Sequence, residues 1–390
     1  MIRGLEQLDM TGKTVFVRAD FNVPVKDGKI TETHRIDSTL PTLRFVIERA
    51  GKVLLASHLG RPGGKPDAQW SLAPVREHLE KSLARPVTLA PDCVGPQVEM
   101  LLRDPGQKVI LLENLRFHKE EEANDPVFSQ ALASLADVYV NDAFGTAHRA
   151  HASTAGMARF FRAKGAGLLL RRELDYLGKV LTNPDRPFVA ILGGAKVSDK
   201  IGMLKNLIPK VDSLLIGGGM AYTFLKARGV AIGKSLIEEE KIPLAREIIS
   251  LAESRRVPLL LPVDHIAAEQ VTAKPITTGA DIPANYMGLD IGPETIGRFC
   301  REIGRARMAL WNGPVGLFEE EEFSRGTRSV AQALVEHGAI SIVAGGDTVA
   351  AVAQAGVDDK ITHLSTGGGA TLEFLEGKIL PGILALEEES

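Results

Sequence analysis

Basic and polar side chains follow the apolar runs in the first half of the chain. Run 14–18 is followed by Asp20, and run 52–57 is followed by His58 and Arg61. Arginine presents a planar guanidinium that can bind a carboxylate or a phosphate through two parallel hydrogen bonds. Several arginines near strand ends would therefore form a pocket for a small molecule with two negative charges. The arginines and histidines in such loop contexts are Arg35, Arg61, Arg116, Arg149, His58, His148 and His151.

Glycines occupy the corresponding positions in the second half. Runs 188–192, 213–216 and 340–344 are apolar, and a glycine pair or triplet follows each of them. Because glycine has no Cβ, such loops let the backbone approach a large ligand closely. We therefore expect two different sites, one for a small anion and one for a larger molecule. The glycines are Gly193, Gly194, Gly217, Gly218, Gly219, Gly345 and Gly346.

Lys196 and Lys200 indicate what the larger molecule carries. They lie between a glycine pair and the apolar helical pattern that begins at Ile201. Cations at the start of a helix oppose its dipole, so an anion held there by both ammonium groups explains them better than helix stability does. The alternative is a pair of ordinary surface lysines. Asp347, beside the glycines at 345–346, then favours a Mg²⁺ site, because Mg²⁺ prefers one or two carboxylates together with phosphate oxygens.

Several common sites are disfavoured. The residues at 12–14 lack the upstream glycine of a P-loop, and a strand follows them. The triplet at 217–219 is followed by Tyr222 where a dinucleotide fingerprint needs its last glycine. His148 and His151 could form a metal pair, but no third ligand is evident in the sequence, so anion binding ranks above metal binding there.

No residue is an obvious general base, and no Ser-His-Asp or Cys-His arrangement stands out. An acceptor that is itself a carboxylate has a pKa near about 4 and is already ionised at neutral pH, so it needs no base. Phosphoryl transfer then requires only alignment of the reactants and cations around the moving charge. The arginines of the first half favour a phosphorylated acid as acceptor over a neutral sugar or alcohol.

Length, charge and cysteine content limit the class of protein. At 390 residues the chain exceeds what one hydrophobic core usually serves, so two domains are expected. Basic and acidic residues balance to 46 − 49 = −3, and we expect no nucleic-acid partner. No apolar stretch has the length of a signal peptide or a membrane span. Cys93 and Cys300 are far apart and lack metal-ligand spacing, which suits a reducing compartment; we expect a soluble cytoplasmic protein with no membrane partner.

Short β-rich runs alternate with amphipathic helical patterns, which is typical of βαβ units and parallel sheets. In the first such helix, apolar residues recur on one face between the candidate cap Ser38 and Gly51. Leucines at helical spacing over 170–181 predict a connecting helix, which turn residues at 182–185 end. Both halves therefore read as doubly wound sheets, in which ligands bind beyond the carboxyl ends of the strands. Further strands are expected at 109–112, 138–140, 259–261 and 308–311.

Long motifs in the chain resemble those of the phosphoglycerate kinase family, in family order and across the whole chain. They are 17–24 (VRADFNVP), 57–62 (SHLGRP), 113–117 (ENLRF), 141–152 (NDAFGTAHRAHA), 192–200 (LGGAKVSDK), 217–220 (GGGM), 311–319 (WNGPVGLFE), 345–348 (GGDT) and 365–370 (STGGGA). Two departures are small. Ala19 stands where the family commonly has a β-branched residue, and Tyr222 where it commonly has Asn, which puts only adenine-side packing in question.

The resemblance implies reversible phosphoryl transfer between ATP and the carboxylate of 3-phosphoglycerate, giving 1,3-bisphosphoglycerate and ADP, with Mg²⁺. In glycolysis this reaction runs towards ATP. It also implies a monomer of the α/β class, with two doubly wound parallel-sheet (Rossmann-like) domains facing across a hinged cleft. The triose-binding domain would comprise 1–169 and a C-terminal tail at about 378–390, the nucleotide-binding domain 186–377, and the connecting helix and hinge 170–185.

By motif position the resemblance implies a role for each candidate residue. The triose substrate would be held by Asp20, Asn22, Arg35, His58, Arg61, Arg116 and Arg149. The catalytic groups would be Arg35, Lys196 and the backbone of Gly368 and Gly369. The nucleotide would be held by Lys200, Gly217, Gly218, Glu319, Gly345, Gly346, Asp347 and Thr348. Within that set, Asp347 would bind the metal, Thr348 a phosphate and Glu319 the ribose.

Two other functions are compatible with the same scaffold. One is a nucleotide-binding interaction protein that has lost catalysis, and the other is a different small-molecule kinase. Every expected catalytic position is filled, which favours the active enzyme over the silent protein.

Overall fold

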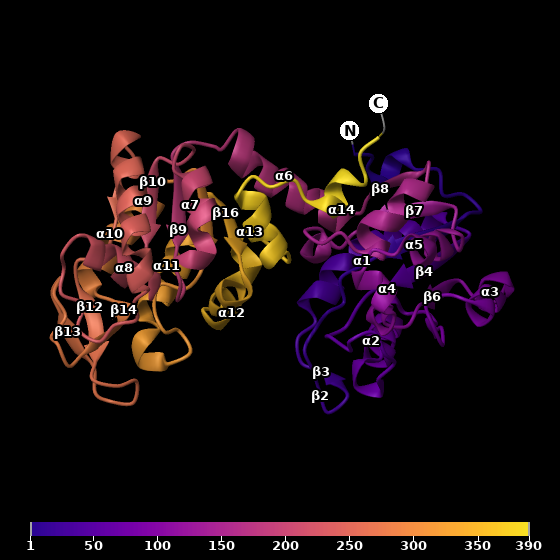
Figure 1. The fold of residues 1–390 in the computed structure, drawn as a ribbon, viewed down its shortest axis with the longest axis horizontal. Coiled ribbons are helices and arrows are strands. Elements are labelled where there is room, and N and C mark those ends of the chain that lie inside the picture. Colours follow the sequence, from indigo (N-terminus) through magenta and orange to yellow (C-terminus); the bar gives the residue numbers. More distant parts are fainter. Residues whose placement is uncertain (1, 389–390) are drawn as a thin grey trace. The chain divides into compact units, whose positions relative to one another are not determined.

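The computed structural model describes residues 2–388, so Met1 and the last two residues of the expected C-terminal tail lie outside the described part. The chain forms two compact units (Figure 1). Unit 1 comprises the chain up to Asp175 together with the segment from Ile379 onward, and unit 2 runs from Tyr176 to Lys378. The boundary falls within helix α6, Leu168–Thr182.

Unit 1 is built on a six-stranded parallel sheet with the order β5-β6-β4-β1-β7-β8. Its strands are β1 Thr14–Arg18, β4 Lys52–Ala56, β5 Thr88–Leu89, β6 Val109–Leu111, β7 Val138–Asn141 and β8 Lys164–Ala166. A short hairpin of β2 Val25–Lys26 and β3 Lys29–Ile30 lies outside this sheet. Val15, Phe16 and Val17 of β1 are all fully buried, as expected for a parallel strand covered on both faces.

The helices of unit 1 fill the connections between its strands. They are α1 His34–Arg49, α2 Ala73–Leu83, α3 Pro96–Arg103, α4 Lys119–Glu122 and α5 Pro126–Ala133. On one face of the sheet, Val17 joins a buried cluster with Leu43 of α1 and Leu79 of α2. On the other face, the ring of Tyr139 in β7 stacks on that of Phe161 with a centroid distance of 5.5 Å. Alternation along each strand therefore supplies two apolar layers.

Unit 2 contains a second six-stranded parallel sheet, with the order β11-β10-β9-β15-β16-β17. Its strands are β9 Phe188–Leu192, β10 Ser213–Ile216, β11 Leu259–Leu260, β15 Met308–Asn312, β16 Ile340–Ala344 and β17 His363–Leu364. A separate antiparallel sheet consists of β12 His265–Ala268, β13 Ile276–Thr278 and β14 Met287–Ile291. Every residue of β9 and β15 is buried, so the large sheet is covered on both faces.

Three helices, α10 to α12, pack on one face of the large sheet in unit 2. Ile191 and Trp311 in the central strands form a buried cluster there with Phe299, Leu334 and Val352 of these helices. The helices of unit 2 are α7 Ile201–Leu207, α8 Met220–Ala227, α9 Ile242–Ser254, α10 Pro293–Ile303, α11 Arg325–Glu336, α12 Gly346–Gln354 and α13 Gly369–Leu375. Across residues 2–388, none of the helices has both the length and the apolar character needed to cross a membrane.

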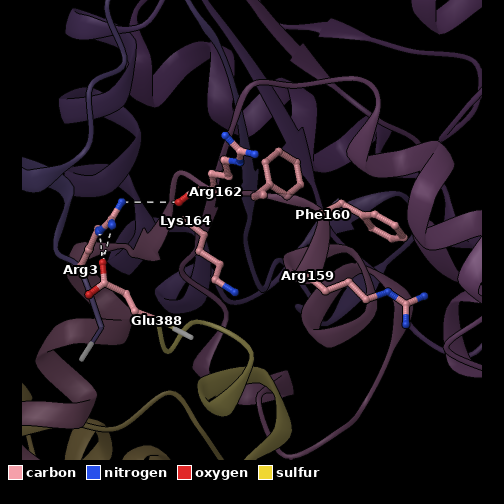
Figure 2. A pocket seen from close by; sticks show the side chains of 7 residues that line it. Arg3, Arg159, Phe160, Arg162, Lys164 and Glu388 are labelled. Carbon is pink, nitrogen blue, oxygen red and sulfur yellow. Dashed lines mark hydrogen bonds and ion pairs between the residues drawn. The ribbon is translucent and has the colours of Figure 1, made fainter. Parts of the chain in front are cut away.

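The last described segment of the chain packs against unit 1. Beside helix α14, Pro381–Leu384, the backbone N–H of Gly382 donates a hydrogen bond of 2.8 Å to Ala147 O. Arg3 Nε donates to Glu388 Oε1 at 2.5 Å, and Figure 2 shows this pair at one side of a cavity. The cavity has a volume of about 580 Å³ and is lined by Arg3, Arg159, Phe160, Phe161, Arg162, Lys164 and Glu388. The two ends of the described chain are thus joined within unit 1.

The predicted α/β class with two parallel sheets is confirmed. The predicted strand 188–192 matches β9, and the predicted strands 213–216 and 340–344 match β10 and β16. The start of the first helix was predicted wrongly. Ser38 does not cap α1, because the helix already begins at His34 and the Ser38 hydroxyl donates to His34 O at 2.7 Å inside it. A serine inside a helix can donate its hydroxyl to the carbonyl four residues earlier, so the residue type alone does not mark a cap.

Trp311 provides a test of packing in unit 2. Its side chain is fully buried, and its Nε1–H donates a hydrogen bond of 2.8 Å to Gly313 O. We expect Trp311→Phe to lower the free energy of unfolding of unit 2 by about 2 kcal/mol, because it leaves a cavity and an unpaired buried carbonyl. Urea denaturation followed by circular dichroism measures this loss. As the control, Trp70→Phe in unit 1 replaces a half-buried indole with a smaller ring and should cost less than about 1 kcal/mol; equal losses would contradict the expectation.

Candidate functional site

Asp20 and Arg35 form the centre of the predicted anion site in unit 1. Arg35 Nη1 donates to Asp20 Oδ2 at 3.0 Å and to Asn22 O at 3.4 Å. Asp20 follows β1 and Arg35 lies in the first turn of α1, so this pair joins a strand end to a helix start. His58, which follows β4, places its Nδ1 3.9 Å from Asp20 Oδ1. The structure therefore brings together four of the seven residues predicted for the small anion.

Gly60 ties Asn22 and a fifth predicted residue, Arg116, to the loop after β4. Asn22 Oδ1 accepts a hydrogen bond from Gly60 N at 2.9 Å, and Arg116 Nη1 donates to Gly60 O at 2.8 Å. Gly60 has a φ of +61°, and a Cβ there would lie 2.0 Å from the ring of Trp70. Only glycine therefore fits this turn. Arg61, the next residue of the loop, is exposed.

Arg18 belongs to this cluster although the sequence did not single it out. It lies at the end of β1 and is only 1% exposed. Its Nε donates to Ser153 Oγ at 2.7 Å, and Ser153 donates to Glu121 from Oγ at 2.6 Å and from its backbone N at 2.9 Å. Arg18 Nη2 lies 3.4 Å from His58 Nδ1. The signal available in the sequence was an arginine at the end of an apolar strand. Because a buried arginine almost always has a partner, this position indicates a paired and constrained guanidinium.

Burial and positive charge keep the histidines of the cluster neutral. Burial holds the pKa of His58 well below its usual range, and the surrounding guanidinium groups lower it further. In order of effect, these arginines are Arg18, Arg116, Arg35 and Arg149. The same causes lower the pKa of His151 to about 4. Desolvation and nearby cations both disfavour an imidazolium. The cluster therefore carries its positive charge on guanidinium groups, and an anionic ligand would neutralise it.

Arg149, the last of the predicted triose residues, is half-buried, and its Nε lies 3.2 Å from Nε2 of His148. His151 Nδ1 lies 3.9 Å from Glu121 Oε1. Within residues 2–388, neither His148 nor His151 belongs to a group of three possible metal ligands. A third ligand for a histidine metal pair is therefore not found among the described residues, and anion binding at this place stays a prediction.

The glycine loops of unit 2 pack backbone against backbone. A Cβ on Gly193 would lie 2.1 Å from Pro314 O, and one on Gly218 would lie 2.7 Å from Gly194 N. Gly218 also has a φ of +65°. A Cβ on Gly217 would lie 2.7 Å from the side chain of Val315. These glycines are therefore needed to bring the ends of β9, β10 and β15 together.

Lys200 and Lys196 lie in different environments. Lys200, at the start of α7, donates a hydrogen bond from Nζ to Asn312 Oδ1 at the end of β15. Burial lowers the pKa of Lys200 to about 8, and the carboxylates of Asp199 and Asp347 oppose this shift. Lys196 is exposed in the loop between β9 and α7. Of the two lysines, Lys200 is thus the one fixed against the end of the sheet.

A cavity of about 240 Å³ lies beside these loops. It brings together Gly218, Glu319 and Asp347 of the predicted nucleotide residues, and both carboxylates are exposed. Its lining residues are Gly194, Ala195, Gly218, Gly219, Tyr222, Leu236, Gly288, Leu289, Pro314, Gly316, Leu317, Glu319 and Asp347. An apolar wall with a few polar groups at its edge suits a flat organic ring that carries polar substituents.

Leu236 and the β14 residues Gly288 and Leu289 were not assigned to this cavity from the sequence, whereas Tyr222 was linked only to adenine-side packing. Tyr222 is 5% exposed, and a Cβ on Gly288 would lie 2.1 Å from its hydroxyl. The bulky tyrosine is therefore accommodated because the residue opposite it has no side chain. No sequence signal linked the small antiparallel sheet to the site, because β14 is far from the glycine loops along the chain.

The remaining predicted residues lie at the starts of two helices. Gly345, with a φ of +95°, precedes α12, which begins with Gly346 and carries Asp347 in its first turn. Thr348 is buried, and its Oγ1 accepts a hydrogen bond from Gly313 N at 2.7 Å, which leaves its hydroxyl proton available to donate. Gly368, with a φ of +52°, precedes α13, which begins with Gly369.

Comparisons with known proteins identify one family. The family model described as phosphoglycerate kinase matches residues 5–378. A phosphoglycerate kinase of Anaeromyxobacter sp. (strain K) is 55% identical over 394 residues, covering 99% of this chain and 100% of the relative. The solved structure of phosphoglycerate kinase from Coxiella burnetii superposes with a TM-score of 0.90 at 44% identity, covering 99% of each chain. The crystal structure from Pyrococcus horikoshii OT3 gives a TM-score of 0.85 at 32% identity, covering 99% of this chain and 98% of the other.

Gly218 allows the close approach of the unit 2 loops to be tested. We expect Gly218→Ala to lower the free energy of unfolding of unit 2 by about 2 to 4 kcal/mol, because strain at positive φ adds to a clash with backbone atoms. Gly229→Ala is the matched control, since Gly229 has a φ of +84° and open space within 4 Å of a Cβ. It should cost only about 1 kcal/mol. Equal losses in thermal or urea unfolding would show that the backbone contact is unimportant.

Proposed function

The chain belongs to the phosphoglycerate kinase family, and we propose how its residues carry out the reversible transfer of a phosphoryl group between ATP and the carboxylate of 3-phosphoglycerate. The forward reaction gives 1,3-bisphosphoglycerate and ADP, and glycolysis runs it towards ATP. The observation that carries the assignment of residues is the pair of distinct sites, a guanidinium cluster in unit 1 and a glycine-walled cavity in unit 2.

The guanidinium cluster of unit 1 binds the acceptor in this proposal. 3-Phosphoglycerate carries a phosphate and a carboxylate, and the arginine fork matches both groups. Asn22 and His58 would orient the acceptor, and neutral His58 can donate a hydrogen bond without adding charge. Asp20 holds Arg35 in place through the 3.0 Å contact. The proposed acceptor residues are Asp20, Asn22, Arg35, His58, Arg61, Arg116 and Arg149.

The cavity of unit 2 binds the nucleotide in this proposal. The adenine would lie against the backbone of Gly217 and Gly218, with Glu319 at the ribose. Lys200 and the loop at 345–348 would contact the phosphates, with Thr348 donating its hydroxyl proton. Support comes from the 240 Å³ cavity, whose lining includes Gly218, Glu319 and Asp347.

Asp347 is the residue that would hold Mg²⁺. Its carboxylate is exposed at the cavity, and it is close enough to Lys200 to raise the pKa of that lysine. Phosphate groups bound to Lys200 would therefore lie near Asp347 as well. One carboxylate combined with phosphate oxygens and water is a donor set that suits Mg²⁺. When bound, the ion would neutralise charge on the nucleotide phosphates.

Arg35, Lys196 and the backbone of Gly368 and Gly369 are the groups that we propose stabilise the moving phosphoryl. Transfer needs the donor and acceptor oxygens nearly in contact and water excluded, so we propose that the two units close by a hinge motion during turnover. The carboxylate acceptor is already ionised, which removes the need for a base. A cytoplasmic location and a monomeric state complete the proposal.

An assay coupled to ADP release tests the reaction and the acceptor. With MgATP we expect turnover on 3-phosphoglycerate and none on serine or glycerate, because neither carries the second anionic group that the arginine cluster requires. Absence of turnover despite tight MgADP binding would favour the alternative, a catalytically silent nucleotide-binding protein. Turnover on glycerate would point to a different small-molecule kinase.

Arg35→Ala should lower kcat by about 1000-fold or more, because arginines that stabilise transferring phosphoryl groups contribute factors of this size. The Kd for MgADP, measured by calorimetry, should stay within about twofold, since Arg35 belongs to unit 1 and the proposed nucleotide residues to unit 2. Arg49→Ala is the matched control on the same helix, with a side chain 48% exposed, and should behave like the unchanged protein. Lost nucleotide binding in Arg35→Ala would contradict the assignment.

Lys200 makes nucleotide binding dependent on pH. Its pKa of about 8 means that the ammonium is present below pH 8 and lost above it. Bound phosphates favour the charged form and raise this pKa, so binding above pH 8 requires uptake of a proton. We expect the MgADP affinity to fall as pH rises from about 8 to 9.5, approaching tenfold per pH unit. Lys200→Arg stays charged and should remove this fall; a fall that persists in the variant would exclude Lys200 as its source.

A further inference from the structure

Cys93, His118 and Asp92 form a cluster in unit 1 that the proposed kinase chemistry does not use. Asp92 and Cys93 lie between β5 and α3, whereas His118 follows the turn Leu115–Phe117, so two separate loops supply the three side chains. Their sulfur, nitrogen and carboxylate oxygen atoms all lie within 4.8 Å of one another. We propose that these three side chains bind a Zn²⁺ ion.

The three ligand atoms are close enough together for small side-chain movements to form a metal site. Zn²⁺ binds thiolate, imidazole and carboxylate at about 2.0 to 2.3 Å, which places the ligand atoms of a tetrahedral site about 3.5 Å apart. His118 Nε2 and Asp92 Oδ1 are 2.6 Å apart, within hydrogen-bond distance. The ion would take the place of the hydrogen between these two atoms, and that hydrogen would move to Nδ1 of the same ring, so the Cys93 thiol proton is the one released. The two side chains would move apart by about 1 Å. Sulfur, nitrogen and oxygen together make a ligand set of intermediate softness, which suits Zn²⁺.

Neighbouring groups hold the three ligands in position. Asp92 Oδ1 also accepts a hydrogen bond from Cys93 N at 2.6 Å. The ring of His118 stacks on Phe128 with a centroid distance of 4.8 Å and an interplanar angle of 25°. The Cys93 thiol donates to Glu113 O at 3.2 Å. Little side-chain freedom is therefore left to lose when an ion binds.

The charge around the thiol favours a cation. Asp92, Glu121 and Glu113 add to burial in raising the pKa of Cys93, so the sulfur lies in a negative potential. A divalent ion would relieve this repulsion and stabilise the thiolate, with release of the thiol proton to solvent.

The cluster is open to solvent on one side. Cys93 is fully buried, whereas the side chains of His118 and Asp92 are 25% and 48% exposed. An ion can therefore enter past the two exposed ligands and keep a water molecule as its fourth ligand.

The chain provides matched controls for each part of the cluster. His78 and Asp37 form a similar imidazole–carboxylate pair, with Nε2 and Oδ1 2.8 Å apart, but without a cysteine in the group. Cys300 is a half-buried thiol in unit 2, 3.7 Å from Ser329 O. If the Cys93 cluster binds the ion, changes at His78 or Cys300 should leave binding intact.

Titration of the nucleotide-free protein with Co²⁺, as a coloured substitute for Zn²⁺, tests the proposal directly. We expect one ion per chain and a near-ultraviolet charge-transfer band from the thiolate to Co²⁺, which Zn²⁺ abolishes by displacement. Cys93→Ser should remove the band. Both Cys93→Ser and His118→Ala should weaken Zn²⁺ binding by more than about 100-fold. Substituting a residue that only hydrogen-bonds to a metal ligand already lowers metal affinity by about 10- to 100-fold, and a direct ligand should matter more.

Calorimetry in buffers of different ionisation enthalpy should show release of about one proton as Zn²⁺ binds. Saturating Zn²⁺ should raise the unfolding midpoint of unit 1 by about 5 °C or more. His78→Ala and Cys300→Ser should retain the band and the affinity. Absence of a thiolate band, binding that survives Cys93→Ser, or loss of binding in either control would overturn the site. Circular dichroism of the metal-free variants shows whether each of them is folded. If Cys93→Ser does not fold, His118→Ala still tests the site, because it removes a ligand at a partly exposed position.

Discussion

Parallel strand pairing is the constraint on which both candidate sites depend. In unit 1, Arg18 at the end of β1 is in register with Ala56 of β4 and Asn141 of β7. In unit 2, Leu192 at the end of β9 is in register with Asn312 of β15. Carboxyl ends of neighbouring strands therefore meet at one edge of each sheet, and the loops that follow them are forced together. The chemistry of each site then follows from the composition of those loops, since the two sheets themselves are built alike.

The two units use this common edge in opposite ways. Unit 2 removes side chains, so that backbone atoms around Gly193, Gly218 and Pro314 come within contact distance, and a cavity lies beside them. The half-buried Lys200 is bound to Asn312 at the end of β15 in the same sheet. Unit 1 instead fills the edge with guanidinium groups; burial and these positive charges together lower the pKa of His58 and keep it neutral. A nucleotide needs a wall that its ring can approach, whereas a small dianion needs donors that reach it. In the proposed function, the same architecture would thus serve two ligands of different size and charge.

The predictable parts of the molecule are those that depend on local pattern. Apolar runs such as Phe188–Leu192 predicted parallel strands because such strands are buried on both faces. The start of α1 was wrong because Ser38 bonds to its own helix. Arg18 was read only as a strand end, since its partners Ser153 and Glu121 come from distant segments. The loops containing Cys93 and His118 likewise meet only in the folded chain, so no spacing along the sequence could reveal that cluster.

The buried Arg18 bears on why unit 1 keeps so much positive charge. Removing a guanidinium from water costs several kcal/mol, and apolar residues of similar volume would often serve stability as well or better. Glu121 offsets part of this cost through Ser153, yet burial also raises the pKa of that carboxyl. Positive charge therefore remains in excess beside His58 before any ligand arrives. Such charges are already desolvated and held in place, so they stabilise a bound anion without reorganisation. Anion binding would therefore offset the free-energy cost of burying these charges during folding.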